Sequence, residues 1–316
     1  MSEIPSVDLN DFLTDDPVEK QAFVNAIGSS FEEIGFVALS GHFLEDELVD
    51  QLYEQIQSFF DLPLETKKSY EIEGLSGQRG YVSFGKESAK GRNVGDLKEF
   101  FHFGQYVEDD PIRAKEYPSN VLVKELPEFN AVGKEVYQKL ELTAKFVLRA
   151  LALYLKLEET YFDDFIHNGN SILRPIHYPP ITEAPDDAVR AAAHGDINLI
   201  TLLMGAHGRG LQVQNRQGDW IDAMAAPDQL MINVGDMLSR HTNNKLKSTI
   251  HRVVNPPQAE WGNSRYSVPF FMHPISEMSL NVLEQWIDAD HPKGFEDITA
   301  GEFLEERLIE LGLKKK

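Results

Sequence analysis

Apolar residues in the first half of the chain recur at the three- and four-residue intervals of amphipathic helices. Phe23, Ile27 and Phe31 follow one another at this spacing, which places them on one helical face. Asp16 and Pro17 precede them, and these residue types favour the N-cap and the first helical position. The pattern predicts helices over residues 17–34, 45–60 and 128–156, and a strand over residues 36–39.

The segment 71–95 interrupts this helical pattern. It carries six glycines, which lower the cost of unusual backbone conformations. A loop of this length in a compact protein is often functional. We therefore predict that residues 71–95 form a loop at the mouth of the functional site, where its closure would keep water out.

The pattern changes after Asn170, where short β-like segments separated by turn residues replace the helices. These segments cover residues 171–178, 198–204, 211–215, 220–223, 229–234, 248–254 and 265–272. Several short antiparallel strands of this kind predict a jelly roll, also called a double-stranded β-helix. Near the end of the chain, Thr299 and Glu302 form a capping box, which predicts a final amphipathic helix.

The predicted fold class is therefore α+β, with a jelly-roll core between helical parts. We divide the chain into an N-terminal helical and mixed region at residues 1–167, the jelly-roll core at 168–276 and a C-terminal helical extension at 277–316. We expect the extension to pack on the core.

Composition and charge exclude several kinds of partner. The chain has 316 residues and a formal net charge of −21, so it would repel the phosphates of nucleic acids. No apolar run reaches the roughly 18 residues of a membrane span, and the N-terminus lacks the features of a signal peptide. The absence of cysteine fits a reducing compartment. We expect a cytoplasmic protein, compatible with a monomer, that binds neither nucleic acid nor membrane.

His194, Asp196 and His251 are the most informative polar residues. His194 and Asp196 precede the apolar run 199–204, and His251 lies in the β-branched segment 248–254. Two imidazoles and one carboxylate on one face of an ion leave positions open for O2 and a co-substrate, as in Fe(II) oxygenases. A structural zinc site would close all four positions, usually with cysteine. The sequence thus predicts a mononuclear iron site.

Arg265 and Ser267 form a second group beside this site. Arg265 follows His251 by 14 positions (265 − 251). In a strand, residues i and i+2 point to the same face. The guanidinium fork of Arg265 and the hydroxyl of Ser267 can then grip one carboxylate. Because the chain is strongly acidic, an anionic co-substrate needs such a local cation.

These motifs belong to a longer pattern that extends over nearly the whole chain. Its other parts are residues 4–9, 34–37, 98–101, 177–180, 210–213, 233–238, 242–253 and 265–271. With this pattern the chain resembles the isopenicillin N synthase-like branch of the iron(II)/2-oxoglutarate-dependent dioxygenases. That branch also includes plant gibberellin and flavonoid oxygenases.

The resemblance implies a role for each group of residues. The implied iron ligands are His194, Asp196 and His251. The implied contacts of the distal carboxylate of 2-oxoglutarate are Arg265, Ser267 and Tyr178. The implied reaction uses O2, with ascorbate as a supporting reductant, to convert 2-oxoglutarate to succinate and CO2 while a small organic substrate is oxidised, most often hydroxylated. The residues expected to line the substrate pocket are Phe100, His102, Tyr81 and Arg79.

Two alternatives stay open at the level of sequence. An iron oxidase of the isopenicillin N synthase type shares the Arg-x-Ser pattern and does not use 2-oxoglutarate, although the C-terminal glutamine of that synthase is missing here. A non-catalytic jelly-roll protein that binds a metal or ligand is the second alternative. The intact His-Asp-His group argues against it. Succinate release in the presence of Fe(II) and 2-oxoglutarate would separate the three.

Overall fold

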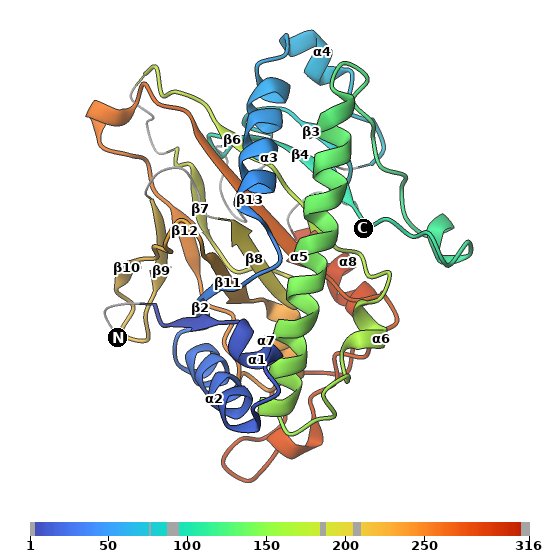
Figure 1. Cartoon of the computed structure of the whole chain (residues 1–316), viewed down its shortest axis with the longest axis vertical. Helices are drawn as coiled ribbons and strands as arrows, with labels where there is room; N and C mark the ends of the chain where they lie inside the picture. Colours follow the sequence, from blue (N-terminus) through green and yellow to red (C-terminus); the bar gives the residue numbers. More distant parts are fainter. Residues whose placement is uncertain (1–3, 76, 87–94, 184–187, 205–209, 311–316) are drawn as a thin grey trace.

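Helices from the first half of the chain cover one face of a large sheet (Figure 1). The computed structural model describes residues 4–75, 77–86, 95–183, 188–204 and 210–310. Helix α5 (Pro127–Tyr154) packs against both α2 (Pro17–Glu33) and α3 (Asp46–Phe60) and lies along the sheet. Further helices are α1 (Asn10–Leu13), α4 (Leu64–Lys68), α6 (Asp163–Ile166), α7 (Asp236–His241) and α8 (Ala300–Glu310).

The three long helices arise as their sequence pattern predicts. At the start of α2, the side chain of Asp16 accepts a hydrogen bond of 2.8 Å from the backbone N–H of Val18. This bond satisfies one of the donors that a helix leaves open at its N-terminus. Phe23, Ile27 and Phe31 on the same helix are all buried. The predicted α2, α3 and α5 are confirmed to within a few residues.

The strands form two sheets in the described part of the chain. The larger sheet follows the order β1 (Ser6–Asp8), β2 (Phe36–Ser40), β11 (Leu230–Val234), β8 (Ile200–Met204), β13 (Arg265–Met272), β5 (Ile172–Leu173), β4 (Glu99–Gly104) and β3 (Gly80–Val82), with β6 (Ile176–Tyr178) paired to β13 and β4. The smaller sheet follows the order β10 (Trp220–Asp222), β9 (Leu211–Gln214), β12 (His251–Val253) and β7 (Ala191–His194). The large sheet therefore joins strands from both halves of the chain.

Two apolar clusters hold these layers together. Between α5 and the large sheet, the ring of Tyr137 meets that of Phe270 edge-on, with centroids 5.0 Å apart. Between the two sheets, Phe36 and Met231 of the large sheet pack with Val213 of the small one. The molecule is thus layered in the order helices, large sheet and small sheet. The helices cover one face of the large sheet, and the small sheet packs against the other.

The strand predictions need two corrections. Residues 191–194 form strand β7, which the sequence pattern did not reveal because its alanines give no alternation of apolar and polar residues. His194 therefore ends a strand of its own, ahead of β8. The segment predicted as a loop at residues 71–95 also contains a strand, β3, which pairs antiparallel to β4.

The C-terminal helix begins with the predicted capping box. The backbone N–H of Thr299 donates to the carboxylate of Glu302 at 2.9 Å, and the N–H of Glu302 donates to the hydroxyl of Thr299 at 3.3 Å. Among the described residues, no helix has the length and apolar character needed to cross a membrane. The division of the chain at residues 167 and 276 stays a prediction.

Candidate active site

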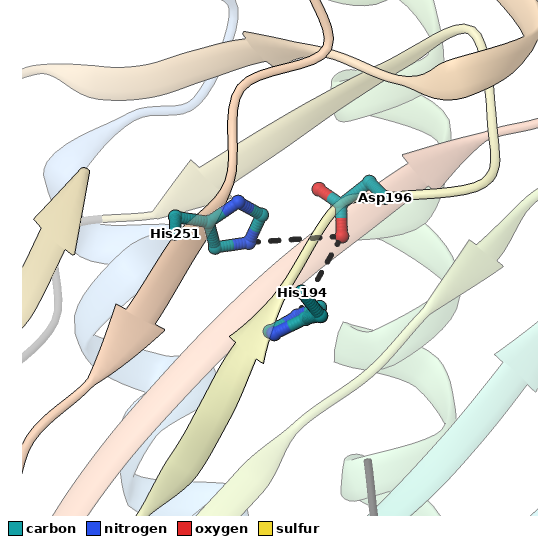
Figure 2. Close-up of side chains that lie close together, drawn as sticks. All are labelled: His194, Asp196 and His251. Carbon is teal, nitrogen blue, oxygen red and sulfur yellow. Dashed lines mark ion pairs between the residues drawn. The ribbon is translucent and has the colours of Figure 1, made fainter. Parts of the chain in front are cut away.

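His194, Asp196 and His251 come together between the two sheets (Figure 2). His194 ends β7, Asp196 lies in the link from β7 to β8, and His251 begins β12. The Nε2 atoms of His194 and His251 lie 3.9 and 3.8 Å from one carboxylate oxygen of Asp196. One ligand atom from each residue lies within 4.8 Å of the other two. These three atoms are close enough to share one ion.

Hydrogen bonds orient both imidazoles toward this common point. The Nδ1 atom of His194 lies 2.7 Å from the carbonyl oxygen of Ala192, and that of His251 lies 3.2 Å from the carbonyl oxygen of Thr249. A carbonyl can only accept, so Nδ1 carries the proton on each ring. Each Nε2 atom is then left with a lone pair for a metal.

Asp196 is fixed by neighbours on two adjacent strands. Its second carboxylate oxygen accepts hydrogen bonds from the hydroxyl of Thr201 at 2.6 Å and from the amide of Asn233 at 2.7 Å. Thr201 and Asn233 are paired across β8 and β11. Burial opposes ionisation of Asp196, but the two imidazoles and these hydrogen bonds outweigh it and lower the pKa of the carboxyl group. One oxygen is therefore held while the other faces the imidazoles.

A buried guanidinium lies on β13, next to the ring of Tyr178. Arg265 is 2% exposed, and its Nε and Nη1 atoms have no hydrogen-bond partner. Its charged group lies 4.9 Å from the centre of the Tyr178 ring, and Ser267 is also buried. Arg265 and Tyr178 are opposite each other across β13 and β6. Because an unpaired buried charge is costly, this arrangement is suited to an anionic ligand.

A buried polar network supports the strand that carries Arg265. The imidazole of His177 stacks on the ring of Tyr266 at 4.8 Å and contacts the carboxylate of Glu99 at 2.8 Å. The ammonium group of Lys67 pairs with the same carboxylate at 2.9 Å. Because Tyr266 lies between Arg265 and Ser267 on the strand, this network contacts β13 on the face opposite those two residues.

Of the residues expected in the substrate pocket, Phe100 and His102 share one face of β4, with ring centroids 4.8 Å apart. The guanidinium of Arg174 stacks over the rings of Phe100 and Phe271, at 4.5 and 5.0 Å. Phe271 is paired with Thr201, the hydrogen-bond donor to Asp196. Phe100 and His102 thus belong to a cluster that reaches the triad.

The other two residues expected in that pocket point elsewhere. The hydroxyl of Tyr81 bonds to Glu99, and the ammonium of Lys67 lies 5.7 Å from the centre of its ring. Arg79 is 1% exposed, packs over Gly104 and donates to the side chain of Gln105. Tyr81 is paired with Phe101, so its side chain lies on the sheet face opposite Phe100 and His102. Both Tyr81 and Arg79 are therefore engaged in the protein interior.

The two residues that follow the glycine-rich segment contact the strand that carries His194 and the residues just before it. The backbone N–H of Leu97 donates to Val189 at 3.0 Å, and Asp96 accepts from the N–H of Ala192 at 3.3 Å, two residues before His194. A Cβ atom on Gly95 would lie 2.0 Å from the carbonyl oxygen of Gly85, so glycine is required at position 95, where the backbone passes close to Gly85. Residues 76 and 87–94 lie outside the described residues.

Sequence reasoning did not identify several residues of this site. Thr201, Asn233 and Arg174 contact the triad or the adjoining aromatic cluster. Alternation along residues 198–204 could have placed Thr201 on the same face as Leu203. The contact with Asp196 depends on strand pairing, which a single sequence does not specify.

Comparisons with known proteins agree with this geometry. Residues 4–125 match the model of the non-haem dioxygenase in morphine synthesis N-terminal domain, and residues 169–274 match the model of the 2OG-Fe(II) oxygenase superfamily. A proline hydroxylase of Petromyces alliaceus is 32% identical over 98% of this chain and 99% of its own length. The chain belongs to the 2OG-Fe(II) oxygenase superfamily.

Solved structures extend the likeness to the whole fold of this oxygenase. A 2OG-Fe(II) oxygenase family protein from Caulobacter crescentus is 42% identical, with a TM-score of 0.88 over 98% of this chain and 100% of the other. A full-length Neurospora crassa protein, solved in complex with alpha-KG, is 29% identical, with a TM-score of 0.86 over 97% of this chain and 95% of the other.

These findings decide between the functions that the sequence left open. The oxygenase is an oxidoreductase that uses Fe(II), 2-oxoglutarate and O2. An iron oxidase that works without 2-oxoglutarate is not favoured, because the relatives are named 2-oxoglutarate-Fe(II) oxidoreductases. The His-Asp-His group also disfavours a non-catalytic binding protein.

Proposed function

We propose that His194, Asp196 and His251 hold the Fe(II) of this oxygenase. The single observation that carries this assignment is their convergence: one ligand atom from each lies within 4.8 Å of the others. Two neutral imidazoles and a carboxylate suit Fe(II) and leave positions for a co-substrate and O2. Thr201 and Asn233 bind the other oxygen of Asp196, which restrains the carboxylate in the orientation that a metal needs.

We further propose that Arg265, Ser267 and Tyr178 bind the distal carboxylate of 2-oxoglutarate. Buried Nε and Nη1 donors on Arg265 without partners support this role, since a guanidinium can hold a carboxylate through two parallel hydrogen bonds. With iron, 2-oxoglutarate and O2 bound, the site would supply oxidative decarboxylation: one oxygen atom of O2 would enter succinate as CO2 is released, and the other would hydroxylate a substrate C–H bond. The protein residues orient the reactants and exclude water.

Binding of 2-oxoglutarate to the Fe(II)-loaded protein without O2 tests the second assignment. Arg265→Met should weaken binding by about 2–4 kcal/mol, or roughly 30- to 1,000-fold, because a buried charge pair is lost. Ser267→Ala should cost on the order of 1 kcal/mol. Iron binding should persist in both variants. Unchanged affinity for 2-oxoglutarate in Arg265→Met would show that the anchor lies elsewhere.

The substrate pocket is proposed to lie at Phe100, His102, Arg174 and Phe271. The Nε–H of Arg174 donates to the Nε2 atom of His102 at 2.5 Å, and the Nδ1 atom of that ring lies 2.6 Å from the carbonyl oxygen of Gly77. His102 therefore accepts from Arg174 as a neutral ring. Flat aromatic faces around a fixed cation favour a small organic substrate that presents a carbonyl or carboxylate oxygen.

Names of similar proteins support that substrate class. One relative is named a proline hydroxylase, and one structure of the Neurospora crassa protein contains thymine. Both molecules are small and carry carbonyl or carboxylate oxygens. A screen of such compounds for faster succinate release should find a stimulating substrate. Arg174→Met should raise its KM, whereas Arg149→Met, which removes a guanidinium bound to Asp163 on the helical side, should not. Equal KM values for Arg174→Met and the unaltered protein would show that Arg174 does not contact the substrate.

The two facing sheets support a jelly-roll assignment for the core. We propose that the small sheet and the central strands of the large one form the double-stranded β-helix, with the triad between them. A cytoplasmic location and a monomeric state stay predictions, which fractionation of the native cells and light scattering would test.

A further inference from the structure

A second buried arginine faces the same tyrosine as Arg265. Arg190 precedes β7 and is 4% exposed. Its guanidinium carbon lies 5.7 Å from the centre of the Tyr178 ring, whereas that of Arg265 lies 4.9 Å from the same centre. Two guanidinium groups thus share one aromatic neighbour in the interior of a protein with a net charge of −21.

The contacts of Arg190 are few for a buried cation. One terminal nitrogen donates to the carbonyl oxygen of Asn263 at 3.3 Å, and the backbone N–H donates to the side chain of Asn255 at 3.0 Å. The Nε atom is buried without a hydrogen-bond partner. Glu260 is the acidic residue whose charge acts on Arg190, but no ion pair within 4 Å joins them in the described part of the chain. One long hydrogen bond does not offset the cost of burying a charge.

The neighbouring cation increases this cost. Burial lowers the pKa of Arg190, and repulsion from Arg265 lowers it further, while Tyr178 and Glu260 act in the opposite direction. Like charges in a poorly solvated site repel each other strongly. An anionic group placed beside them would relieve the repulsion and occupy the donors that lack partners. The proposed ligand of Arg265, 2-oxoglutarate, carries such a group.

We infer that Arg190 is a second cationic residue of the 2-oxoglutarate site and selects for a co-substrate with a distal carboxylate. The inference rests on the proposed binding of that carboxylate by Arg265. Arg265 and Ser267 bind the carboxylate from β13. Arg190 adds positive charge from the segment before β7, from which it also approaches Tyr178. Loss of Arg190 should therefore weaken binding of a dicarboxylate and spare a 2-oxo acid that lacks the distal charge.

Two ligands of equal length isolate this effect. 2-Oxopentanoate has the keto and carboxylate groups of 2-oxoglutarate, but a methyl group replaces the distal carboxylate. Calorimetric titration of the Fe(II)-loaded protein without O2 should show that Arg190→Met weakens 2-oxoglutarate binding about 10- to 100-fold, the range expected when one charge-assisted contact is lost. The affinity for 2-oxopentanoate should change less than about threefold, and Arg190→Lys should recover part of the loss.

A control variant tests whether the loss of an arginine outside the site changes ligand binding. Arg216 also donates to backbone carbonyl oxygens, those of Glu32 and Glu33 at 3.0 and 3.1 Å, but lies outside the site. Arg216→Met should leave both affinities unchanged. Equal weakening of both ligands by Arg190→Met, or no weakening of either, would overturn the inference while Arg265→Met still identifies the anchor. Failure of the unaltered protein to bind 2-oxoglutarate would instead overturn the proposed function.

Discussion

The hydroxyl of Thr201 offers a way to disturb Asp196 without changing a metal ligand. Thr201→Val keeps the shape of the side chain and removes the hydrogen bond of 2.6 Å to the carboxylate. Both residues are buried, so water cannot readily replace the lost donor. Asn233 keeps its bond of 2.7 Å to the same oxygen. We therefore expect Asp196 to remain near the imidazoles but to be held less firmly.

The two hydrogen bonds to the Asp196 carboxylate determine how much Fe(II) affinity Thr201→Val should lose. Hydrogen bonds to charged groups contribute about 1.5–3 kcal/mol, and loss of a partner behind a metal ligand typically reduces affinity about 10- to 100-fold. Because one of the two partners remains, we expect the lower part of that range, about 10- to 30-fold. The hydroxyl also lowers the pKa of Asp196. Its loss should raise that pKa, so metal affinity should begin to fall at a higher pH as the solution is acidified.

Equilibrium titration with Fe(II) under argon, repeated across the acidic pH range, measures both effects. Thr143→Val is the matched control, because Thr143 is equally buried and its hydroxyl donates to the backbone carbonyl of Lys139 at 2.9 Å. The control should bind iron as the unaltered protein does. A folded Thr201→Val protein with unchanged affinity and unchanged pH dependence would refute the role given to this hydroxyl.

Three further predictions address the metal, the buried network and the loop. Replacement of any one triad residue by alanine should abolish tight Fe(II) binding in a protein that still folds, and metal analysis showing normal iron content would exclude that residue as a ligand. At Glu99, burial opposes ionisation, but bonds from His177, Tyr81 and Lys67 hold the pKa below its usual 4.5. The resulting stability is present above pH 4.5 and is lost as the pH falls through the folded-state pKa. Glu99→Gln should therefore lower the free energy of unfolding near pH 7 by about 3 kcal/mol and flatten its acid dependence, as urea titrations would show; an unchanged acid limb would contradict this. Hydrogen exchange in residues 77–86 and 95–98 should slow when 2-oxoglutarate and substrate bind, and equal rates with and without ligands would argue against a lid.

The sequence was most informative where local chemistry determines structure. The cap at Asp16 and the capping box at Thr299 and Glu302 occur as expected, because each depends on residues only two or three positions apart. The triad was also foreseeable, since its residue types are those that a metal selects. Strand β7 was missed because a short run of alanines carries no periodic signal.

Features that depend on strand pairing could not be predicted. The pairing of Thr201 with Asn233 brings both to Asp196, and no spacing along the chain encodes that register. The same holds for Arg190, which reaches Tyr178 from a different part of the chain. Tyr81 was expected in the substrate pocket because it lies in the glycine-rich segment. Its hydroxyl instead bonds to Glu99, a contact that position along the chain does not reveal.

The origin of the oxygen in succinate tests the central claim most directly. Oxidative decarboxylation removes C1 of 2-oxoglutarate as CO2 and converts C2 into a new carboxylate that takes one oxygen atom from O2. The Fe(II)-loaded protein, incubated with 2-oxoglutarate, a stimulating substrate and ¹⁸O-labelled O2, should yield succinate with one ¹⁸O atom by mass spectrometry, and Asp196→Ala should yield none. Succinate without the label, or equal labelled succinate from Asp196→Ala, would contradict a 2-oxoglutarate-dependent reaction at this triad.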